Sequence, residues 1–584
     1  MKFTLSNKEE ILWGRRISNG LVWRSKFSNE AAWPSIDRIF RSDYGDLEST
    51  PRFNLIYMMG QTLIPNIVFQ SPGVINTAVK PELTFLASIW DSIDNMWIKH
   101  SEMRDVLKEV ALSSFLYNTT AVQIGYDFDT NSDKLGKDQE FLTNLKGVTN
   151  RSRATNLPWL DVIQPHRFIT GVGTKTMRDC CWAAKLVSAP VASLKKIPGL
   201  KNVTWSKLPD EILKHEMITW ENRDRSKWCN FWQIHDAETG KWCWLSTSGK
   251  FLFAPEDDPL QVLGLPFEVV SFNQNLQSIF GTPDSEYIRT QHQEGEEVRR
   301  DSMYMRRFSL PKFVYDSNVI KPEDVESLLS AQVAPGIPAN LGESGEDDIR
   351  KHLYVFTPPT SLTLHQQYTK ELLNDAQLIT GFGPNQMGTF APGRRTKYET
   401  QVVESTNSSR TAFRRNYIAN MAEGLIKRAN ILISQNWSSD MVTQVIGVDG
   451  AIYWVKVTPQ ELSNVEDGLV TEVNVESLAP VSRERRKMEA GNLLNMLGSM
   501  VDAGVNPMPI IKQLLSQYEW IDIRQVLPQM TGEYELAAWT QVQEDKLKLG
   551  TAGKSAQTNL QGVTALAERL PAEQNGAIDE TNND

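Results

Sequence analysis

Apolar residues at helical spacing mark the stretch from Thr357 to Trp437 as two helices separated by a break. They recur about every four or seven positions in both limbs, Leu362–Thr380 and Thr396–Trp437. The stripes are Leu364, Tyr368, Leu372 and Ile379 in the first limb and Phe413, Tyr417, Met421, Leu425 and Leu432 in the second. Because Gly381–Gly393 is rich in Gly and Pro, the pattern predicts two helices joined by a loop.

The chain before residue 130 predicts an irregular start followed by helices and a strand. Residues 1–45 are rich in Trp and Arg but lack a sustained apolar period, which predicts an irregular arm. The elements expected next are the helix Phe53–Gly60, the strand Asn66–Gln70, one long helix from Pro81 to Phe115 and the strand Ala121–Tyr126. Proline suits the first turn of that long helix.

Residues 157–280 predict a β-rich region in which short runs alternate with turns of Asp, Gly and Pro. The runs are Val162-Ile163, Phe168-Ile169, Cys181–Val187, Phe231–Ile234, Trp242–Leu245, Phe251–Phe253 and Phe267–Phe272. The region also holds Trp205, Trp220, Trp228, Trp232, Trp242 and Trp244. Such an aromatic cluster favours a core or a subunit interface over a ligand cage.

The segment Asp284–Phe308 predicts a helix that is polar nearly all round. Its charged residues are Glu286, Arg289, Glu294, Glu296, Glu297, Arg299, Arg300, Asp301, Arg306 and Arg307. A helix of this kind is either solvated or lies against another helix through ion pairs. The strands Lys312–Tyr315 and Leu353–Phe356 are expected after it.

The last third of the chain predicts strands, then helices, then a tail. The expected strands are Val442–Val448, Ala451–Val457 and Val470–Val475, and the expected helices are Ser482–Val501 and Met508–Tyr518. From about residue 540 the composition shifts to Gln, Ala, Gly, Thr, Asn and acidic residues, which predicts a largely disordered end.

Composition limits the classes of protein that fit. A length of 584 residues allows several compact units, and 40% hydrophobic with 23% charged residues is ordinary for a soluble protein. The net charge of −10 argues against gripping nucleic acid by a large basic surface, although not against enclosing it. No window approaches about 18 apolar residues, and Met1–Glu10 lacks a secretory signal, so no membrane contact is expected.

Candidate chemistry is sparse. The four cysteines lack metal-site spacing and are interpreted as thiols of a reducing cytosol. Gly553-Lys554-Ser555 resembles the end of a P-loop, but Lys548 stands where its first glycine belongs. Histidines are scattered singly, and acidic pairs lie in charged runs rather than in apolar pockets. No catalytic residue, metal site or cofactor is therefore expected.

Taken in order, these elements resemble the portal (head–tail connector) proteins of tailed double-stranded DNA bacteriophages, most closely those of short-tailed, podovirus-type phages. Four stretches carry the resemblance: Asn54–Pro72 with Tyr117–Tyr126, Val162–Thr170 with Arg178–Trp182, Leu265–Asp284, and the helix–loop–helix Leu362–Trp437. Together they cover roughly residues 50–480. The order of the elements, rather than any single motif, is what is similar.

The resemblance implies an α+β portal fold, in which an elongated subunit with an α/β wing, a two-helix stem, a small β-containing clip and a helical crown assembles as a ring of about twelve copies. Its parts would be an N-terminal arm (1–45), wing (46–280), first stem helix (281–309), clip (310–360), second stem helix (361–380), tunnel loop (381–395), long wing helix (396–437), wing strands (438–481), crown (482–530) and C-terminal tail (531–584).

The same resemblance implies a channel at one capsid vertex through which viral double-stranded DNA is packaged and ejected. Expected partners are other copies of the chain, the major capsid protein, a terminase on the clip, and tail adaptor proteins. The protein would assemble in the host cytoplasm and reside in the virion. The alternatives are a virion-associated hydrolase with a site in the Trp-rich region, and a minor head or scaffold protein without a channel.

Two sets of residues become candidates for facing DNA or the channel. The tunnel-loop set is Gly383, Asn385, Gln386, Met387, Arg394, Arg395 and Lys397, and the charged stem set is Glu286, Arg289, Glu294, Glu297 and Arg300. The basic loop residues either touch phosphates or pair with Glu399 or Glu404 on the next helix. The run Ser405–Ser409 is a poor helix former and puts the continuity of that helix in question.

Overall fold

The computed structural model describes residues 7–43, 53–80, 83–126, 157–195, 197, 199–209, 228–260, 262, 264–308, 312–315, 353–356, 362–381, 397–437, 441–446, 451–458, 460, 469–475 and 529–548. Helix and sheet are mixed throughout, as the α+β class requires. The chain divides into two compact units. The first is formed by Met1–Trp33, Gln61–Pro283 and Ser408–Asp584, the second by Pro34–Gly60 and Asp284–Asn407.

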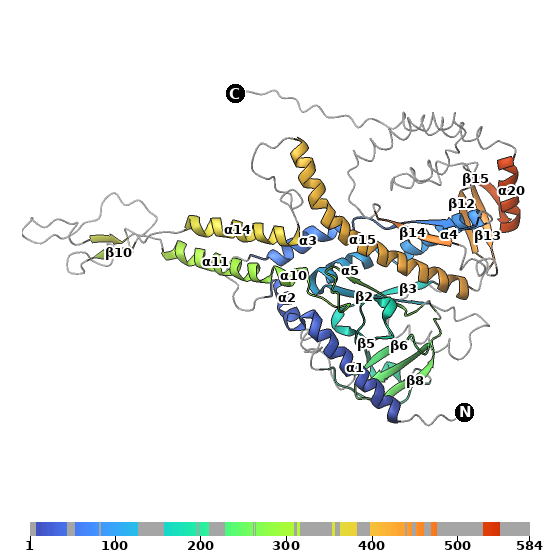
Figure 1. Cartoon of the computed structure of the whole chain (residues 1–584), viewed down its shortest axis with the longest axis horizontal. Helices are drawn as coiled ribbons and strands as arrows, with labels where there is room; N and C mark the ends of the chain where they lie inside the picture. The colour runs from blue at the N-terminus through green and yellow to red at the C-terminus, as the bar shows by residue number, and fades with distance from the viewer. Residues whose placement is uncertain are drawn as a thin grey trace, which may run out of the picture. The chain divides into compact units, whose positions relative to one another are not determined.

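The N-terminal part of the first unit is a helix, so the prediction of an irregular arm is wrong. α1 (Asn7–Ser28) lies along the β-rich region and is followed by the 3-10 turn Glu30–Ala32 and by α2 (Trp33–Phe40) (Figure 1). Its buried residues recur at helical spacing and are Trp13, Ile17, Gly20, Arg24 and Ser28. Only two of these carry a large apolar side chain, which is why an apolar pattern did not reveal the helix.

The β-rich region forms a five-stranded antiparallel sheet in the order β4-β5-β6-β7-β8. Its strands are β4 (Phe168–Thr170), β5 (Trp182–Pro190), β6 (Trp228–Asp236), β7 (Lys241–Ser246) and β8 (Phe251–Asp257). Trp13 and Ile17 of α1 pack onto it beside Trp232, while Trp242 and Trp244 are buried in a neighbouring cluster. The tryptophan cluster is thus mostly core, as predicted. Trp205 is the exposed exception, and Trp220 lies outside the described residues.

A second sheet of the same unit has the order β3-β2-β9, with β2 (Thr119–Tyr126), β3 (Pro158–Ile163) and β9 (Phe267–Ser271) antiparallel. The helices before it differ from the prediction. The single long helix is two, α4 (Thr84–His100) and α5 (Met103–Tyr117), because Glu102 adopts a left-handed φ of 52° between them. The apolar stripe runs on across this break and concealed it.

Another correction concerns α3 (Leu55–Ile67), which replaces both the shorter helix and the strand predicted at Asn66–Gln70. Leu55, Met59, Leu63 and Ile67 are fully buried at four-residue spacing, so one helical stripe runs the whole length. Pro65 lies inside the helix.

The remainder of the first unit combines α15 with two small sheets. α15 (Lys397–Asn436) is helical without interruption through Ser405–Ser409, which settles its continuity. β1 (Gly73–Ala78) pairs with β14 (Leu469–Asn474), and β12 (Met441–Ile446), β13 (Ile452–Val457) and β15 (Gln529–Glu535) form a three-stranded sheet. The predicted C-terminal tail therefore begins too early: β15 and α20 (Leu536–Lys548) are folded, and Trp539 is 1% exposed. The predicted crown helices, within 482–528, lie outside the described residues.

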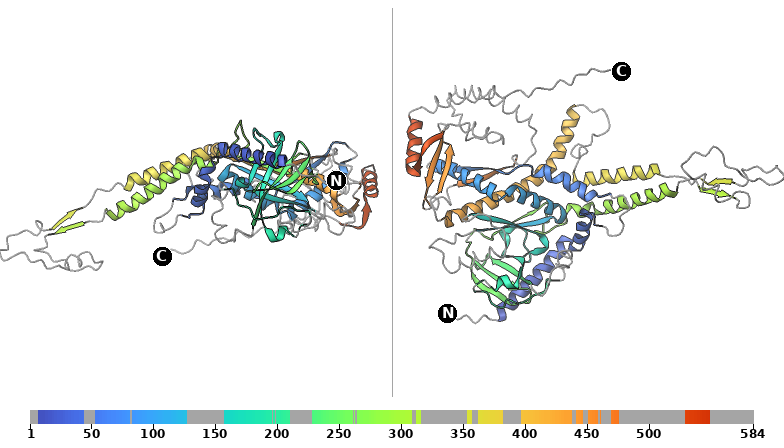
Figure 2. Two further views of the ribbon diagram at one scale, coloured as in Figure 1. Left: turned by 90° about the horizontal axis from the view of Figure 1, so that it is seen from below. Right: turned by 180° about the vertical axis from the view of Figure 1, so that it is seen from behind.

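In the second unit, the long helices α11 (Arg289–Phe308) and α14 (Leu362–Thr380) lie side by side in every view (Figure 1 and Figure 2). The short α10 (Asp284–Tyr287) precedes α11. β10 (Lys312–Tyr315) and β11 (Leu353–Phe356), which lie between α11 and α14 in the chain, pair antiparallel. The two helices and two strands predicted here are confirmed.

Candidate functional site

The seam between α11 and α14 is narrow and combines a few apolar side chains with one polar contact. Val298 of α11 and Leu372 and Ala376 of α14 are buried. Nearer the far end of α11, the Ser302 hydroxyl and His365 Nδ1 are 3.3 Å apart. A seam this narrow leaves most of each helix surface outside the contact. We call these two helices the stem pair.

The apolar stripe predicted along α14 is mostly turned outward. Leu364 is 64% exposed, and Tyr368 and Ile379 are each 42% exposed; Leu372 alone of the four is buried. Leu378 joins the stripe at 66% exposure. Exposed apolar side chains that follow one flank of a helix are typical of a contact with another molecule. The predicted helix and its helical spacing are confirmed.

The charged stem residues lie on α10 and α11. Glu286 and Arg289 form a fork-like ion pair, with the guanidinium donating at 2.8 and 2.9 Å. Glu294, Glu297 and Arg300 are exposed. His292 of α11 is buried, and burial lowers its pKa. Its Nδ1 accepts a hydrogen bond from the Leu55 N–H at 3.4 Å.

The exposed charges of α11 are separated by sign. At about 100° per residue, Glu294, Glu297 and Asp301 follow one flank, whereas Arg300 and Arg307 follow the adjacent flank. The exposed Arg299 and Arg306 lie on the side opposite the acidic flank. Sequence reasoning counted these charges without separating them, although their spacing was available to do so. The stem pair thus presents an acidic, a basic and an apolar flank.

The candidate tunnel loop is almost entirely outside the described residues. α14 ends at Gly381 with φ of 79°, a left-handed conformation that glycine adopts easily. Gly383, Asn385, Gln386, Met387, Arg394 and Arg395 fall in the undescribed range 382–396, and Lys397 is the first residue of α15. Their role toward DNA stays a prediction.

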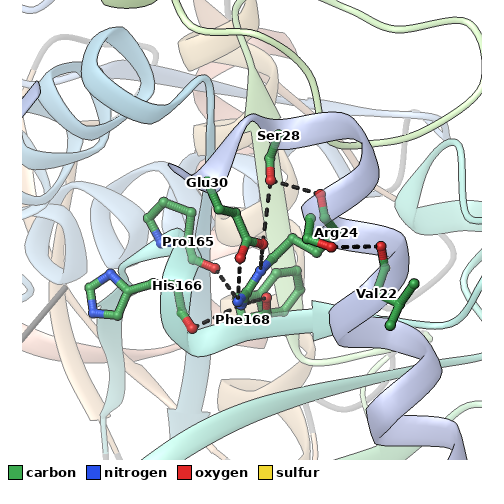
Figure 3. Close-up of polar contacts among 8 residues, drawn as sticks. Val22, Arg24, Ser28, Glu30, Pro165, His166 and Phe168 are labelled. Carbon is green, nitrogen blue, oxygen red and sulfur yellow. Dashed lines mark hydrogen bonds and ion pairs between the residues drawn. The ribbon is translucent and has the colours of Figure 1, made fainter. Parts of the chain in front are cut away.

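In the first unit, α1 is locked to the β-rich region by one guanidinium. Arg24 is fully buried and donates to the carbonyls of Pro165, His166 and Phe168 at 3.0, 2.8 and 3.0 Å. It also pairs with the buried carboxylate of Glu30 (Figure 3). This arrangement satisfies the guanidinium completely, so it is a structural clamp rather than a binding site.

Two places resemble a hydrolase site. In the tryptophan-rich sheet, His235 Nδ1 is 2.5 Å from a carboxylate oxygen of Asp258. Burial acts to raise the pKa of Asp258, but the contacts with His235 and the Leu260 N–H together lower it. His235 is 1% exposed, so no substrate reaches its ring. The second is a cavity of about 1310 Å³ beside α15, where the carboxylates of Glu268 and Glu423 each pair with a cation, Arg428 and Lys427. Neither site offers a free acid–base pair.

Potential metal ligands and thiols are placed as follows. Across the ranges that the structure describes, no three His, Cys, Asp or Glu side chains gather to hold a metal. Cys180, Cys229 and Cys243 are buried free thiols and Cys181 is exposed; burial raises the pKa of Cys180 to about 11. No helix within the described ranges is long and apolar enough to cross a membrane.

The amino-acid sequence was also compared with known proteins. No protein-family model matches the chain, and no curated protein matches it.

Proposed function

We propose that this chain is a portal protein: a subunit of a ring-shaped channel at a capsid vertex through which double-stranded DNA passes. The observation that carries the proposal is the stem pair, whose three exposed flanks differ in kind. In a monomer, the apolar stripe of Leu364, Tyr368 and Leu378 and the separated acidic and basic stripes would all stay exposed to solvent. In a ring of identical copies, each stripe would contact a neighbouring copy.

Head-to-tail contact between copies would match these flanks. In a heterologous ring each subunit presents one surface to the preceding copy and a different one to the next. The acidic flank at Glu294, Glu297 and Asp301 would then meet the basic flank at Arg300 and Arg307 of a neighbour, and the apolar stripe of α14 would be covered.

The net charge of the chain favours a channel that lets DNA slide through over one that binds DNA tightly. Duplex DNA carries about one charge per 1.7 Å, and a strongly basic lining would hold it by counterion release. A net charge of −10 favours weak contact. The terminase on the clip, the major capsid protein at the wing, tail adaptors and a copy number near twelve enter the proposal through the family resemblance alone.

Electron microscopy of the purified chain tests the proposal, because a portal forms rings with an open axis.

The hydrolase alternative loses support from the buried His235 and the neutralised Glu268. A minor head or scaffold protein without a channel differs from a portal in this same experiment, since it would show no axial opening.

A further inference from the structure

The cavity beside α15 is lined by residues spread along that helix, and we call it the groove. Its floor is a helical stripe of α15 from Tyr417 to Ser434, which at about 1.5 Å per residue extends over about 26 Å. One wall is β9 together with the loop after it and residues 175–178; the other is β14 with Trp90. The groove thus runs between strands that belong to two different sheets.

β9 is an edge strand, and its free edge borders this groove. In antiparallel sheets the hydrogen-bonded pairs alternate. Ile124 N–H donates to Pro266 O, and Phe272 N–H donates to Asn118 O, so Glu268 and Val270 also point their backbone groups at β2. The N–H and C=O groups of the alternate residues, Phe267, Val269 and Ser271, therefore point away from β2. None of the hydrogen bonds among the described residues uses them.

Other described parts of the chain contact both faces of β9 and leave its outer edge unpaired. On one face of β9, Val269 packs against a buried apolar cluster that Met177 also contacts. On the other, Glu268 pairs with Arg428 of α15, and a Cβ at Gly424 would clash with Glu268, so the helix and strand approach closely. A strand beside β9 would enter the slot between these two supports.

Charge restricts what fits. The carboxylates of Glu268 and Glu423 are paired with Arg428 and Lys427. Lys175 and Arg178, on the same wall as β9, are exposed, and no described carboxylate pairs with either. The lining is therefore cationic, and an incoming segment with carboxylates is favoured there.

We propose that this groove binds an extended acidic segment of another protein, which adds as a strand to the free edge of β9. A polypeptide backbone is the ligand that repeats donors and acceptors at the spacing of a strand edge. At about 3.3 Å per residue, about eight residues fill the length of the groove. Their carboxylates would reach Lys175 and Arg178, and apolar side chains would contact Met421 and the 91%-exposed Leu276.

Selection from a display library of random peptides about ten residues long tests this inference on the full chain. Enriched peptides should carry Asp or Glu among apolar residues. In Val269→Pro the outward N–H is lost while the pairing of β9 with β2 is kept, since proline is tolerated at such edge positions. Val269→Pro should weaken binding at least about tenfold, whereas the matched Val269→Thr should bind like the wild type. The double reversal Lys175→Glu with Arg178→Glu should weaken it about fivefold.

Hydrogen exchange gives a readout that does not depend on any variant folding. The amides of Phe267, Val269 and Ser271 should exchange fast in the free chain and become protected with the selected peptide bound. Those of Glu268 and Val270 should be slow in both. The inference is overturned if no peptide is enriched, if the three amides are unaffected by peptide, or if they are already protected by self-association, which would make a second copy the occupant. Ring formation plays no part in these outcomes.

Discussion

The buried carboxyl group of Asp94 accepts a hydrogen bond from the side-chain amide of Asn76 at 2.7 Å. Asn430 of α15 reaches the same oxygen at 3.4 Å, and Thr471 of β14 donates to Asn76 at 2.6 Å. One carboxyl group therefore joins α4, β1, β14 and α15. Its other oxygen, and the Oδ1 of Asn430, have no partner among the described residues.

Asp94→Asn should remove a pH dependence of stability. Burial raises the pKa of Asp94 from 3.8 to about 7, with a smaller contribution from Asp91. The folded chain thus holds a proton that the unfolded chain loses between about pH 4 and pH 7, so stability falls as the pH rises through that window. At about 1.4 kcal/mol per pKa unit the loss is on the order of 4 kcal/mol at most. Urea unfolding of wild type and variant across this range measures it.

Because the wild type loses stability as the pH rises, the advantage of Asp94→Asn over the wild type should grow up to about pH 7 and then level off. The side-chain amide of the new asparagine should also donate to the unpartnered oxygen of Asn430. Asp105→Asn, at an exposed site on α5, is the control and should show no such trend. Parallel pH profiles for wild type and Asp94→Asn would refute the role of this carboxyl group.

Arg24→Met should strongly destabilise the first unit. It leaves the buried carboxylate of Glu30 and three carbonyls without their donor, at a cost of about 3–5 kcal/mol. Arg24→Lys should recover only part of the lost stability, because one ammonium group cannot reach all four acceptors. The exposed Arg15→Met on the same helix should change stability by less than about 0.5 kcal/mol. Equal urea midpoints for Arg24→Met and Arg15→Met would contradict the claim that Arg24 fastens α1 to the β-rich region.

Trp539→Ala should lower stability by about 3–5 kcal/mol, because the ring is 1% exposed and packs in one cluster with Trp90 and Tyr453. Trp205→Ala, at a 51%-exposed ring, should have little effect. Thermal unfolding of both variants compares them. A small loss for Trp539→Ala would mean that β15 and α20 do not belong to the folded unit.

Charge reversal in the stem should reveal contacts between copies. Glu297→Arg and Arg300→Glu should each weaken ring assembly, with each lost pair contributing up to about 1 kcal/mol per interface. The double variant should recover assembly, because the two flanks exchange sign together. Light scattering after size-exclusion chromatography measures the assembled fraction. Lys250→Glu, exposed in the first unit, is the control; additive defects in the double variant would argue against flank-to-flank pairing.

Sequence reasoning found the elements whose buried face is apolar and missed those whose buried face is not. The strands of the five-stranded sheet and the limits of α14 and α15 follow directly from apolar runs and Gly/Pro breaks. α1 escaped because Gly20, Arg24 and Ser28 occupy its buried stripe. For Gly20 the reason is space: a Cβ there would lie 2.9 Å from the Thr170 carbonyl oxygen.

The candidate sites show the same limit. Spacing alone placed Glu294, Glu297 and Arg300 on a charged helix surface and Leu364 and Tyr368 on an apolar stripe, but it could not show that this stripe is exposed in the single chain. The groove beside α15 was not foreseen, because its walls come from segments far apart in sequence. Only the register of β9 against β2 shows which backbone groups face it.

Negative-stain electron microscopy of the purified full-length chain tests the central claim most directly. A portal predicts closed rings with a stain-filled axial opening and a mass, from light scattering, that is a whole multiple of the 66.2 kDa subunit. High salt should shift the rings toward smaller species, because the flanks of α11 are charged. Monomers at all concentrations, or discs without an axial opening, would contradict the account.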